Sequence, residues 1–167
     1  YHGPDGLKRI ASKIHGLTKV ADRALKEMGF NQVNESYFDT LRVEGLNEYQ
    51  LKSIIHAARS KEINFYYGGD SIQLSIDETT ELTDIQDIIH CFAADFDVEP
   101  SCKEHCNNLE LSWNSNFVRS SEFMTHKIFN SHYMEHEILR YIKGLENKDL
   151  SLTHSMISLG SCTMKLN

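Results

Sequence analysis

The chain has 167 residues, of which 40% are hydrophobic and 25% are charged. This length and composition fit one ordinary globular domain, or one small domain with a piece of another, and they disfavour intrinsic disorder. The longest apolar runs contain only a few residues, far short of the roughly 20 that a membrane-spanning helix needs. We therefore expect a soluble, folded protein.

The net charge of −7 is unevenly distributed along the chain. Residues 1–30 carry six basic residues (Lys or Arg) and three acidic ones. Residues 31–100 carry four basic and fourteen acidic residues, and residues 101–167 carry seven of each. An acidic middle region disfavours nucleic acid as a partner, because it would repel phosphate groups.

The first 30 residues predict a long amphipathic helix. Pro4 stands where the first helical turn favours proline, and Gly29 stands where a helix commonly ends. Between them apolar residues recur every three or four positions, at Leu7, Ile10, Ile14, Leu17, Ala21, Ala24 and Met28.

A strand and a second helix are predicted next. Leu41 and Val43 alternate with charged residues, and Gly45 closes this strand. Asn47 and Gln50 have the spacing of a capping box, so a helix should begin there and continue to about residue 60. Two further alternating runs, residues 63–67 and 72–76, flank a pair of glycines and predict a β-hairpin.

The rest of the chain predicts two more helices separated by a connecting region. Thr83 and Gln86 have cap spacing ahead of an apolar stripe formed by Ile85, Ile88, Ile89, Phe92 and Phe96. Residues 98–131 show no sustained period. A last helix is predicted from His132 to Leu145. The order of helices and strands favours the α+β class, in which helices cover one face of a small antiparallel sheet.

The sequence HYMEH, from His132 to His136, matches the H-x-x-E-H pattern of a class of zinc peptidases. In that pattern two histidines one turn apart bind the metal and the glutamate acts as a base. On a helix the two histidines would lie about 40° apart, nearly opposite the stripe of Met134, Ile138 and Leu145 that should be buried. A surface or interface histidine pair is therefore the preferred interpretation.

Four cysteines favour reduced thiols of an intracellular protein over a disulfide framework (Cys91, Cys102, Cys106 and Cys162). Cys102, His105 and Cys106, together with Cys91, could supply four metal ligands. A Cys-x3-Cys spacing is weaker than paired Cys-x2-Cys knuckles, and no second close pair exists, so no metal site is predicted.

The last ten residues, SLGSCTMKLN, have the composition of a loop that binds a polar ligand. Backbone and hydroxyl donors of Gly160, Ser161 and Thr163 could hold a phosphate or a carboxylate. Cys162 could instead be a nucleophile with His154 as its base, and an ordinary turn is a further interpretation. The residues alone leave these alternatives open.

Five stretches carry a resemblance that spans nearly the whole chain. They are YHGPDGLKRIA (1–11), YFDTL (37–41), IDET (76–79), FMTHKIFN (123–130) and NKDLSLTHSMISLGSCTMKLN (147–167). In this order they resemble glycine dehydrogenase (decarboxylating), the P-protein family of the glycine cleavage system. The last stretch resembles the segment that opens the second half of that protein, whereas the region around CKEHCNNLELSW is least similar.

The resemblance implies a pyridoxal-phosphate enzyme with an aspartate-aminotransferase-like fold (fold type I), built from two homologous halves. Residues 1–98 would be the small C-terminal α+β domain of the first half, residues 99–120 the connecting arm, and residues 121–167 the start of the second, catalytic half. We expect the chain to be an internal fragment of such a protein, inactive without the large cofactor domain.

The resemblance also implies decarboxylation of glycine and transfer of the aminomethyl group to the lipoyl arm of the H-protein. In the family the lysine that holds pyridoxal phosphate lies in a His-Lys-Thr stretch beyond the position of Asn167, so Lys165 is not expected to be that lysine. No catalytic residue is expected within the chain. The residues expected to line the pocket near the cofactor or the substrate carboxylate are His154, Gly160, Ser161, Cys162 and Thr163.

The partners implied are the H-protein, the missing catalytic half and a second copy of the parent protein, with no nucleic acid and no membrane. The implied location is the cytoplasm in a bacterium, which is favoured, or the mitochondrion in a eukaryote. Two alternatives stay open, a zinc hydrolase that uses HYMEH and a non-catalytic interaction module.

Overall fold

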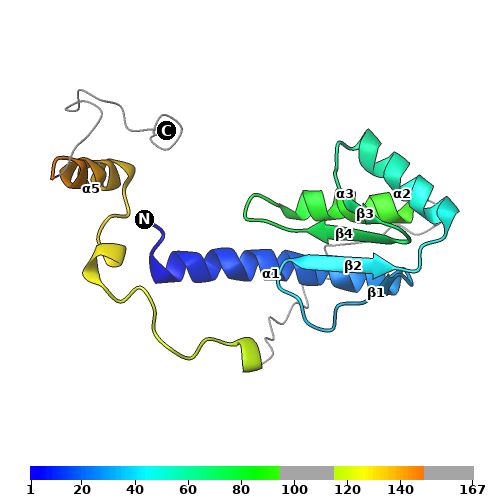
Figure 1. The fold of residues 1–167 in the computed structure, drawn as a ribbon, viewed down its shortest axis with the longest axis horizontal. Coiled ribbons are helices and arrows are strands. Elements are labelled where there is room, and N and C mark those ends of the chain that lie inside the picture. Colours follow the sequence, from blue (N-terminus) through cyan, green and yellow to red (C-terminus); the bar gives the residue numbers. More distant parts are fainter. Residues whose placement is uncertain (95–114, 149–167) are drawn as a thin grey trace. The chain divides into compact units, whose positions relative to one another are not determined.

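The computed structural model describes residues 1–94 and 115–148, which belong to two compact units (Figure 1). The helical unit contains Tyr1–Leu7 and the residues from Ser121 onward, and the sheet unit contains Lys8–Ser120. The described residues combine α-helices with a four-stranded antiparallel sheet, so the α+β class is confirmed. Among the described helices we find no candidate for a membrane-spanning segment.

Helix α1 (Gly3–Glu27) is the long amphipathic helix that the periodicity predicts. Of the predicted stripe, Ala21 and Ala24 are buried and Leu7 is 40% exposed, while the other members are half-buried (Ile10, Ile14, Leu17 and Met28). Val20 and Leu25, which the stripe does not include, are at most 1% exposed. The helix ends in a Schellman motif, in which the N–H of Gly29 donates to the carbonyl of Lys26 and the N–H of Phe30 donates to the carbonyl of Leu25. Gly29 has a φ of 82°, which glycine adopts without steric cost.

The sheet has the strand order β1-β2-β4-β3, and all neighbours are antiparallel. Its strands are β1 (Asn31–Gln32), β2 (Thr40–Glu44), β3 (Tyr66–Gly68) and β4 (Ser71–Ser75). In the central pair Leu41 lies opposite Leu74 and Val43 lies opposite Ile72, and all four are at most 3% exposed. Because alternate residues of a strand point to the same side, one face of the sheet forms the core.

Helices α2 (Glu48–Ser60) and α3 (Leu82–Ala93) complete the sheet unit. Their buried residues join those of α1, β2 and β4 in one hydrophobic cluster. Phe92 of α3 meets Phe30 edge-on, with ring centroids 5.2 Å apart, so the end of α3 packs beside the end of α1. Each large apolar side chain buried in this way contributes roughly 1.5–3 kcal/mol, which makes the cluster the main source of stability in this unit.

The capping box predicted for α2 is confirmed. The Asn47 Oδ1 atom accepts a hydrogen bond from the Gln50 N–H at 2.9 Å, and the Gln50 Oε1 atom accepts one from the Asn47 N–H at 3.0 Å. Two backbone donors that have no partner within the helix are therefore satisfied by side chains of the first turn.

The cap predicted for α3 is wrong. The N-cap is Glu81, two residues earlier than Thr83, and the carboxylate of Asp84, not the amide of Gln86, accepts the hydrogen bond from the Glu81 N–H at 2.8 Å. A negative charge in the first turn interacts favourably with the helix dipole, and a charged acceptor forms the stronger hydrogen bond. Phe96, predicted for the same helix, lies outside the described residues.

The hairpin is confirmed, but its turn lies one residue later than the predicted pair of glycines and its first strand is shorter. Gly68 ends β3 and pairs with Ser71, so the turn consists of Gly69, which has a φ of 64°, and Asp70. Strand β3 covers only Tyr66–Gly68, because the alternating run from residue 63 begins as a loop whose apolar residues pack against the core. Strand β1 has no signal in the sequence, since two residues cannot show a period.

The helical unit contains a short 3-10 helix, η2 (Lys127–Asn130), and helix α5 (Glu135–Glu146). The predicted last helix therefore exists, but it begins three residues later than His132. No residue of α5 is buried within the described structure. A further 3-10 helix, η1 (Ser115–Phe117), belongs to the sheet unit.

Candidate functional site

The residues predicted to line a ligand pocket lie outside the described residues. This holds for His154, Gly160, Ser161, Cys162 and Thr163. Cys102, His105 and Cys106, considered above as metal ligands, also lie outside them. Their assignments stay predictions, and the site described below is built from residues that precede them in the chain.

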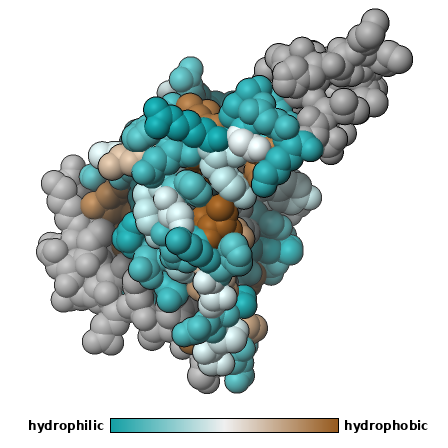
Figure 2. Space-filling view, turned by 90° about the vertical axis from the view of Figure 1, so that its left-hand side faces the viewer, coloured by the Kyte–Doolittle hydropathy of each residue, from teal (hydrophilic) through white to brown (hydrophobic). Residues whose placement is uncertain are grey.

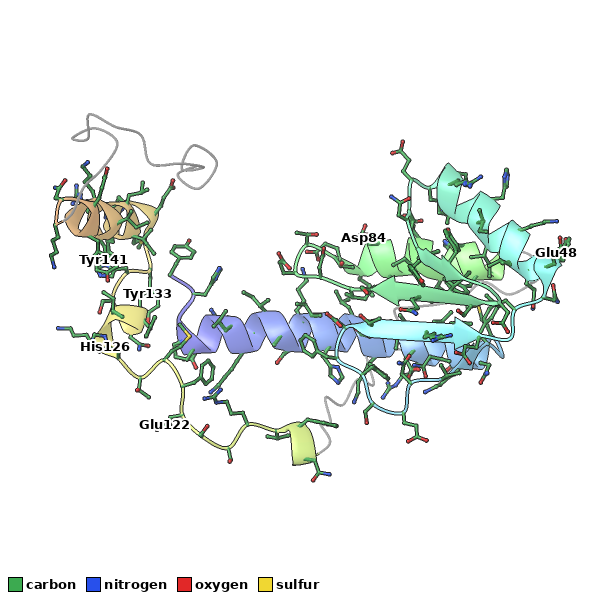
Figure 3. All side chains as sticks on the ribbon, viewed as in Figure 1. Glu48, Asp84, Glu122, His126, Tyr133 and Tyr141 are labelled. Carbon is green, nitrogen blue, oxygen red and sulfur yellow. The ribbon has the colours of Figure 1, made fainter. Side chains whose placement is uncertain are left out.

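The stretch FMTHKIFN forms a turn that presents a histidine on the surface of the helical unit (Figure 3). His126 is the N-cap of η2, and its Nδ1 atom accepts a hydrogen bond from the Ile128 N–H at 3.2 Å. A neutral imidazole with Nδ1 as acceptor carries its proton on Nε2. Because the side chain is exposed, this Nε2–H group can donate to an external acceptor.

Asn130 holds this turn together. Its Nδ2 atom donates to the carbonyl of Met124 at 3.2 Å and to that of His126 at 3.4 Å, and its Oδ1 atom accepts from the Tyr133 hydroxyl at 3.4 Å. Met124 has a φ of 52°, in the left-handed region that residues other than glycine rarely adopt. The amide of Asn130 therefore stabilises a backbone conformation that Met124 alone would not favour.

The N-terminal segment packs against the same turn within the helical unit. Gly3 has a φ of 63°, and a Cβ atom at this position would lie 3.2 Å from the Phe129 carbonyl oxygen and 3.3 Å from Cε1 of Tyr133. Only a glycine allows this close approach without displacing the backbone. The stretches YHGPDGL and FMTHKIFN, far apart in the sequence, therefore form one surface.

The geometry does not support a zinc site in HYMEH. His132 precedes α5, and its ring stacks on Tyr141 with centroids 4.7 Å apart and planes at 19°. His136 is exposed within α5, so the two histidines are not the consecutive-turn pair that the motif requires. No group of three or more potential metal ligands occurs among the described residues.

The stretch YFDTL belongs to a polar network in the sheet unit. The Tyr37 hydroxyl donates to the Asp22 carboxylate at 2.9 Å, and the Lys26 Nζ atom lies 2.8 Å from the same carboxylate, which is buried. With its amide oriented so that both ends find partners, Gln32 also donates to Asp22, at 3.1 Å. Burial, reinforced by the hydrogen bond to Asp22, raises the pKa of Tyr37 well above its ordinary value.

The stretch IDET forms the turn before α3. The Asp77 Oδ1 atom accepts hydrogen bonds from the backbone N–H and the hydroxyl of both Thr79 and Thr80, at 2.8 to 3.0 Å. These bonds lower the pKa of Asp77, because they favour the ionised form. The role of this stretch in the described structure is therefore to shape the entry into α3.

The described residues supply a scaffold and the exposed imidazole of His126, but no complete catalytic arrangement. Tyr37 contacts a carboxylate, yet its raised pKa opposes ionisation, and the Cys91 thiol is buried, which raises its pKa as well. Neither group has the lowered pKa that a nucleophile needs.

Comparison with known proteins shows what these stretches have in common. The family model described as "Glycine cleavage system P-protein" matches residues 1–92, more than half of the chain. This region contains α1, the whole sheet, α2 and most of α3. The chain belongs to the glycine cleavage system P-protein family.

Individual relatives extend the similarity beyond the region that the family model matches. The chain is 48% identical over 172 residues to "Glycine dehydrogenase (decarboxylating)" of Christiangramia forsetii and 44% identical over 173 residues to the protein of that name in Nostoc punctiforme. It is 44% identical over 168 residues to "Glycine dehydrogenase (decarboxylating), mitochondrial" of Pisum sativum. In each case 100% of the chain is covered, but only 16% to 18% of the P-protein relative.

Proposed function

We propose that the chain is part of a pyridoxal-phosphate-dependent glycine dehydrogenase (decarboxylating). Such an enzyme removes carbon dioxide from glycine and passes the aminomethyl group to the lipoyl arm of the H-protein. The alignment carries this proposal, because it covers 100% of the chain in bacterial and plant relatives that bear this name. When bound, pyridoxal phosphate supplies an electron sink for the electrons left by the departing carboxylate.

Within that enzyme, residues 1–98 are the small α+β domain that ends the first half of an aspartate-aminotransferase-like (fold type I) protein. Residues 99–120 are the connecting arm, and residues 121–167 begin the second half. The α+β architecture of the sheet unit supports the first of these assignments. The chain alone is inactive in this proposal, because the lysine that holds the cofactor lies outside it.

The candidate pocket residues have a donor chemistry that fits a phosphate or a carboxylate. Ser161 and Thr163 supply hydroxyl groups, and Gly160 supplies a backbone N–H without a side chain of its own. His154 and Cys162 complete the proposed pocket wall. These residues would bind and orient the anionic group, whereas proton transfer at the substrate carbon would belong to residues outside the chain.

The proposed partners are the H-protein, the catalytic half and a second copy of the parent protein. The proposed location is the cytoplasm in a bacterium or the mitochondrion in a eukaryote, and relatives of both kinds match the chain. The zinc hydrolase is not favoured, since the two histidines do not share a helix. A non-catalytic module is the remaining alternative.

Exchange of labelled carbon dioxide into glycine tests the proposed activity. We expect the full-length parent protein to catalyse this exchange when pyridoxal phosphate and lipoylated H-protein are both present, and to lose it when either is omitted. Unlipoylated H-protein is the matched control. A full-length protein that binds pyridoxal phosphate but shows no exchange with lipoylated H-protein would contradict the proposal and favour the non-catalytic module.

A further inference from the structure

Helix α5 exposes an apolar face that the periodicity of the sequence predicts to be buried. Met134, at its N-cap, is 60% exposed, Ile142 is 54% exposed and Leu145 is 46% exposed. Together with the half-buried Ile138 they occupy one side of the helix, because residues three and four apart share a face. We call these four residues the α5 apolar face. On the side of the molecule drawn in Figure 2, hydrophobic areas lie open between hydrophilic ones.

The opposite side of α5 has the composition of a surface that faces water. His136, Arg140 and Lys143 lie on that side and are all exposed. Lys143 also forms an ion pair with Glu146 at 2.8 Å. The helix is therefore amphipathic, with one side suited to water and one side suited to an apolar partner.

The described structure covers this side only in part. The ring of His132 stacks on Tyr141, which lies beside the face, but no residue of α5 is buried, and the helix has 12 residues. Isolated helices of this length are marginal in water, and most of the stability of a helix comes from packing its apolar side. Single exposed apolar residues are ordinary, but several on one helical face indicate an interaction surface.

The size of the relatives indicates what covers this face. The chain aligns over its whole length, yet it amounts to only 16% to 18% of each relative, so most of a P-protein lies outside these residues. We propose that the α5 apolar face is an interface with a part of the same P-protein polypeptide that lies outside residues 1–167. This proposal rests on membership of the family and not on the catalytic activity proposed above.

The chemistry of the face defines the surface that it contacts. Its side chains are aliphatic or thioether groups without charge, so the complementary surface must be apolar and free of unpaired charges, which would be costly to bury there. His136, Arg140 and Lys143 would remain at the solvent side of the interface. Burial of the face is then expected to protect the backbone amides of α5 from hydrogen exchange.

Site-specific photo-crosslinking in the full-length protein tests the proposal. A benzophenone amino acid replaces Ile142 in one variant and Arg140, on the opposite side of α5, in the matched control. Equal amounts of protein grown in ordinary and in heavy nitrogen are unfolded, mixed and refolded together, so that any oligomers contain both kinds of chain and mass spectrometry separates links within one polypeptide from links between copies. We expect the variant at position 142 to link to peptides outside residues 1–167 of the same polypeptide, several-fold more than the control.

Each other outcome overturns the proposal. Links between ordinary and heavy chains would show that a second copy covers the face. Links that stay within residues 1–167 would show that the chain covers itself, and links to another protein would identify a separate partner. Equal yields at positions 142 and 140 would show that nothing covers the face.

A pair of charge substitutions provides a second measurement that does not depend on crosslinking. Ile142→Asp places a carboxylate in the proposed interface, whereas Arg140→Asp introduces the same group in the middle of the helix on the solvent side. In the full-length protein we expect faster hydrogen exchange of α5 amides for Ile142→Asp and an unchanged rate for Arg140→Asp. Equal exchange rates in the two variants would overturn the proposal. Because neither readout measures activity, a failure here is distinguishable from a failure of the glycine exchange assay.

Discussion

The carboxylate of Asp22 connects two segments that are distant in the sequence. It is buried, and it accepts a hydrogen bond from Tyr37 while it pairs with Lys26 one turn further along α1. A buried charge is tolerated only when it is paired and hydrogen-bonded, so the network must form together with the core. The stretch YFDTL therefore fastens the segment before β2 to helix α1.

The raised pKa of Tyr37 predicts a loss of stability at alkaline pH. The folded state keeps the phenol protonated above its ordinary pKa of 10.0, whereas the unfolded state releases the proton there. The unfolded state then binds fewer protons, so the free energy of unfolding falls as the pH rises above 10, by at most about 1.4 kcal/mol per pH unit for one group. Between about pH 9 and 11 we expect the free energy of unfolding, measured with urea, to fall less steeply with pH in Tyr37→Phe than in the wild type.

A control for this prediction is the exposed Tyr49, which is 70% exposed. Tyr49→Phe should leave the pH dependence unchanged. If the free energy of unfolding falls equally with pH in Tyr37→Phe and Tyr49→Phe, burial of the Tyr37 phenol is not the cause of the loss of stability at alkaline pH.

Gly3 gives a second prediction at the scale of a single residue. Gly3→Ala combines a φ of 63° with a Cβ atom 3.2 Å from the Phe129 carbonyl oxygen, so we expect a cost of about 1–2 kcal/mol. The N-terminal segment should then separate from the turn around residues 124–133. Faster hydrogen exchange of that turn in the full-length protein would show this.

Gly144→Ala is the matched control for the same chemical change. Gly144 lies inside α5, and a Cβ atom there would meet nothing within 4 Å. Alanine is the better helix former, so this change should stabilise α5 by about 0.5–1 kcal/mol. Equal exchange rates in Gly3→Ala and the wild type would disprove the close packing inferred at Gly3.

At the scale of the elements, the caps show how helix starts are chosen. The box of Asn47 and Gln50 formed as its spacing predicts, whereas Thr83 and Gln86 have the same spacing and do not cap α3. The Asp77 turn delivers the chain so that Glu81 becomes the N-cap, and Asp84 then reaches its N–H. The geometry of the preceding turn therefore decides between two local signals.

Two alanine substitutions distinguish the predicted cap from the observed one. Asp84→Ala removes the acceptor for the Glu81 N–H and should lower the free energy of unfolding by about 0.5–1 kcal/mol. Thr83→Ala changes an exposed residue that makes no cap contact, and its effect should stay within about 0.5 kcal/mol. Chemical denaturation of both variants provides the comparison, and a larger cost for Thr83→Ala would reverse the assignment.

Helix α5 contrasts with the helices of the sheet unit. Helices α1, α2 and α3 bury their apolar sides in one cluster, while Met134, Ile142 and Leu145 of the α5 apolar face are exposed. All four helices have comparable amphipathic patterns. The pattern therefore shows which side of a helix is suited to burial, but it does not show which part of the protein buries that side. This is the physical basis for proposing an interface on α5.

At the scale of the whole molecule, the chain is a P-protein family member that spans 16% to 18% of the relatives that it matches. The proposed catalytic assignment concerns the larger protein, and within this chain it depends on the loop predicted for residues 158–167. Gly160 and its neighbours should therefore contribute to the activity of the whole enzyme and not to the stability of the sheet unit.

Gly160→Val tests this separation in the full-length enzyme. A branched side chain next to the hydroxyl and backbone donors would obstruct a phosphate or carboxylate, so we expect the glycine exchange rate to fall by at least about tenfold, which corresponds to about 1.4 kcal/mol. Hydrogen exchange of the core strands β2 and β4 should not change. A comparable loss of exchange activity and of core protection would contradict the assignment of this loop to a pocket.

Much of the sheet unit could be predicted from the sequence, because its elements have local signals. The heptad-like stripe of α1, the alternation around Leu41 and Val43, and the box at Asn47 each depend on neighbours within a few residues. Strand β1 was missed because it owes its existence to pairing with β2, and two residues carry no period. The shortened β3 likewise reflects packing of the preceding residues against the core.

In contrast to the sheet unit, little of the candidate site could be predicted from the sequence. FMTHKIFN was singled out only as a resemblance, and nothing in its spacing predicted that Asn130 would hold a left-handed Met124 or that Gly3 would pack beside Phe129. One local signal was available for the Asp22 network. An acidic residue directly follows Ala21 on the buried side of α1, and such a position calls for a partner.

By itself the sequence determined the amphipathic sides of the helices, the alternation of the central strands and the similarity to the P-protein family. These properties depend on residues that are close together along the chain, or on the order in which the motifs occur. Only the tertiary structure decided that the two ends of the helical unit share a surface, that the Tyr37 hydroxyl binds Asp22 and that most of the α5 apolar face stays exposed in the described residues. Contacts between distant segments depend on how the chain folds back on itself, and no local period records that.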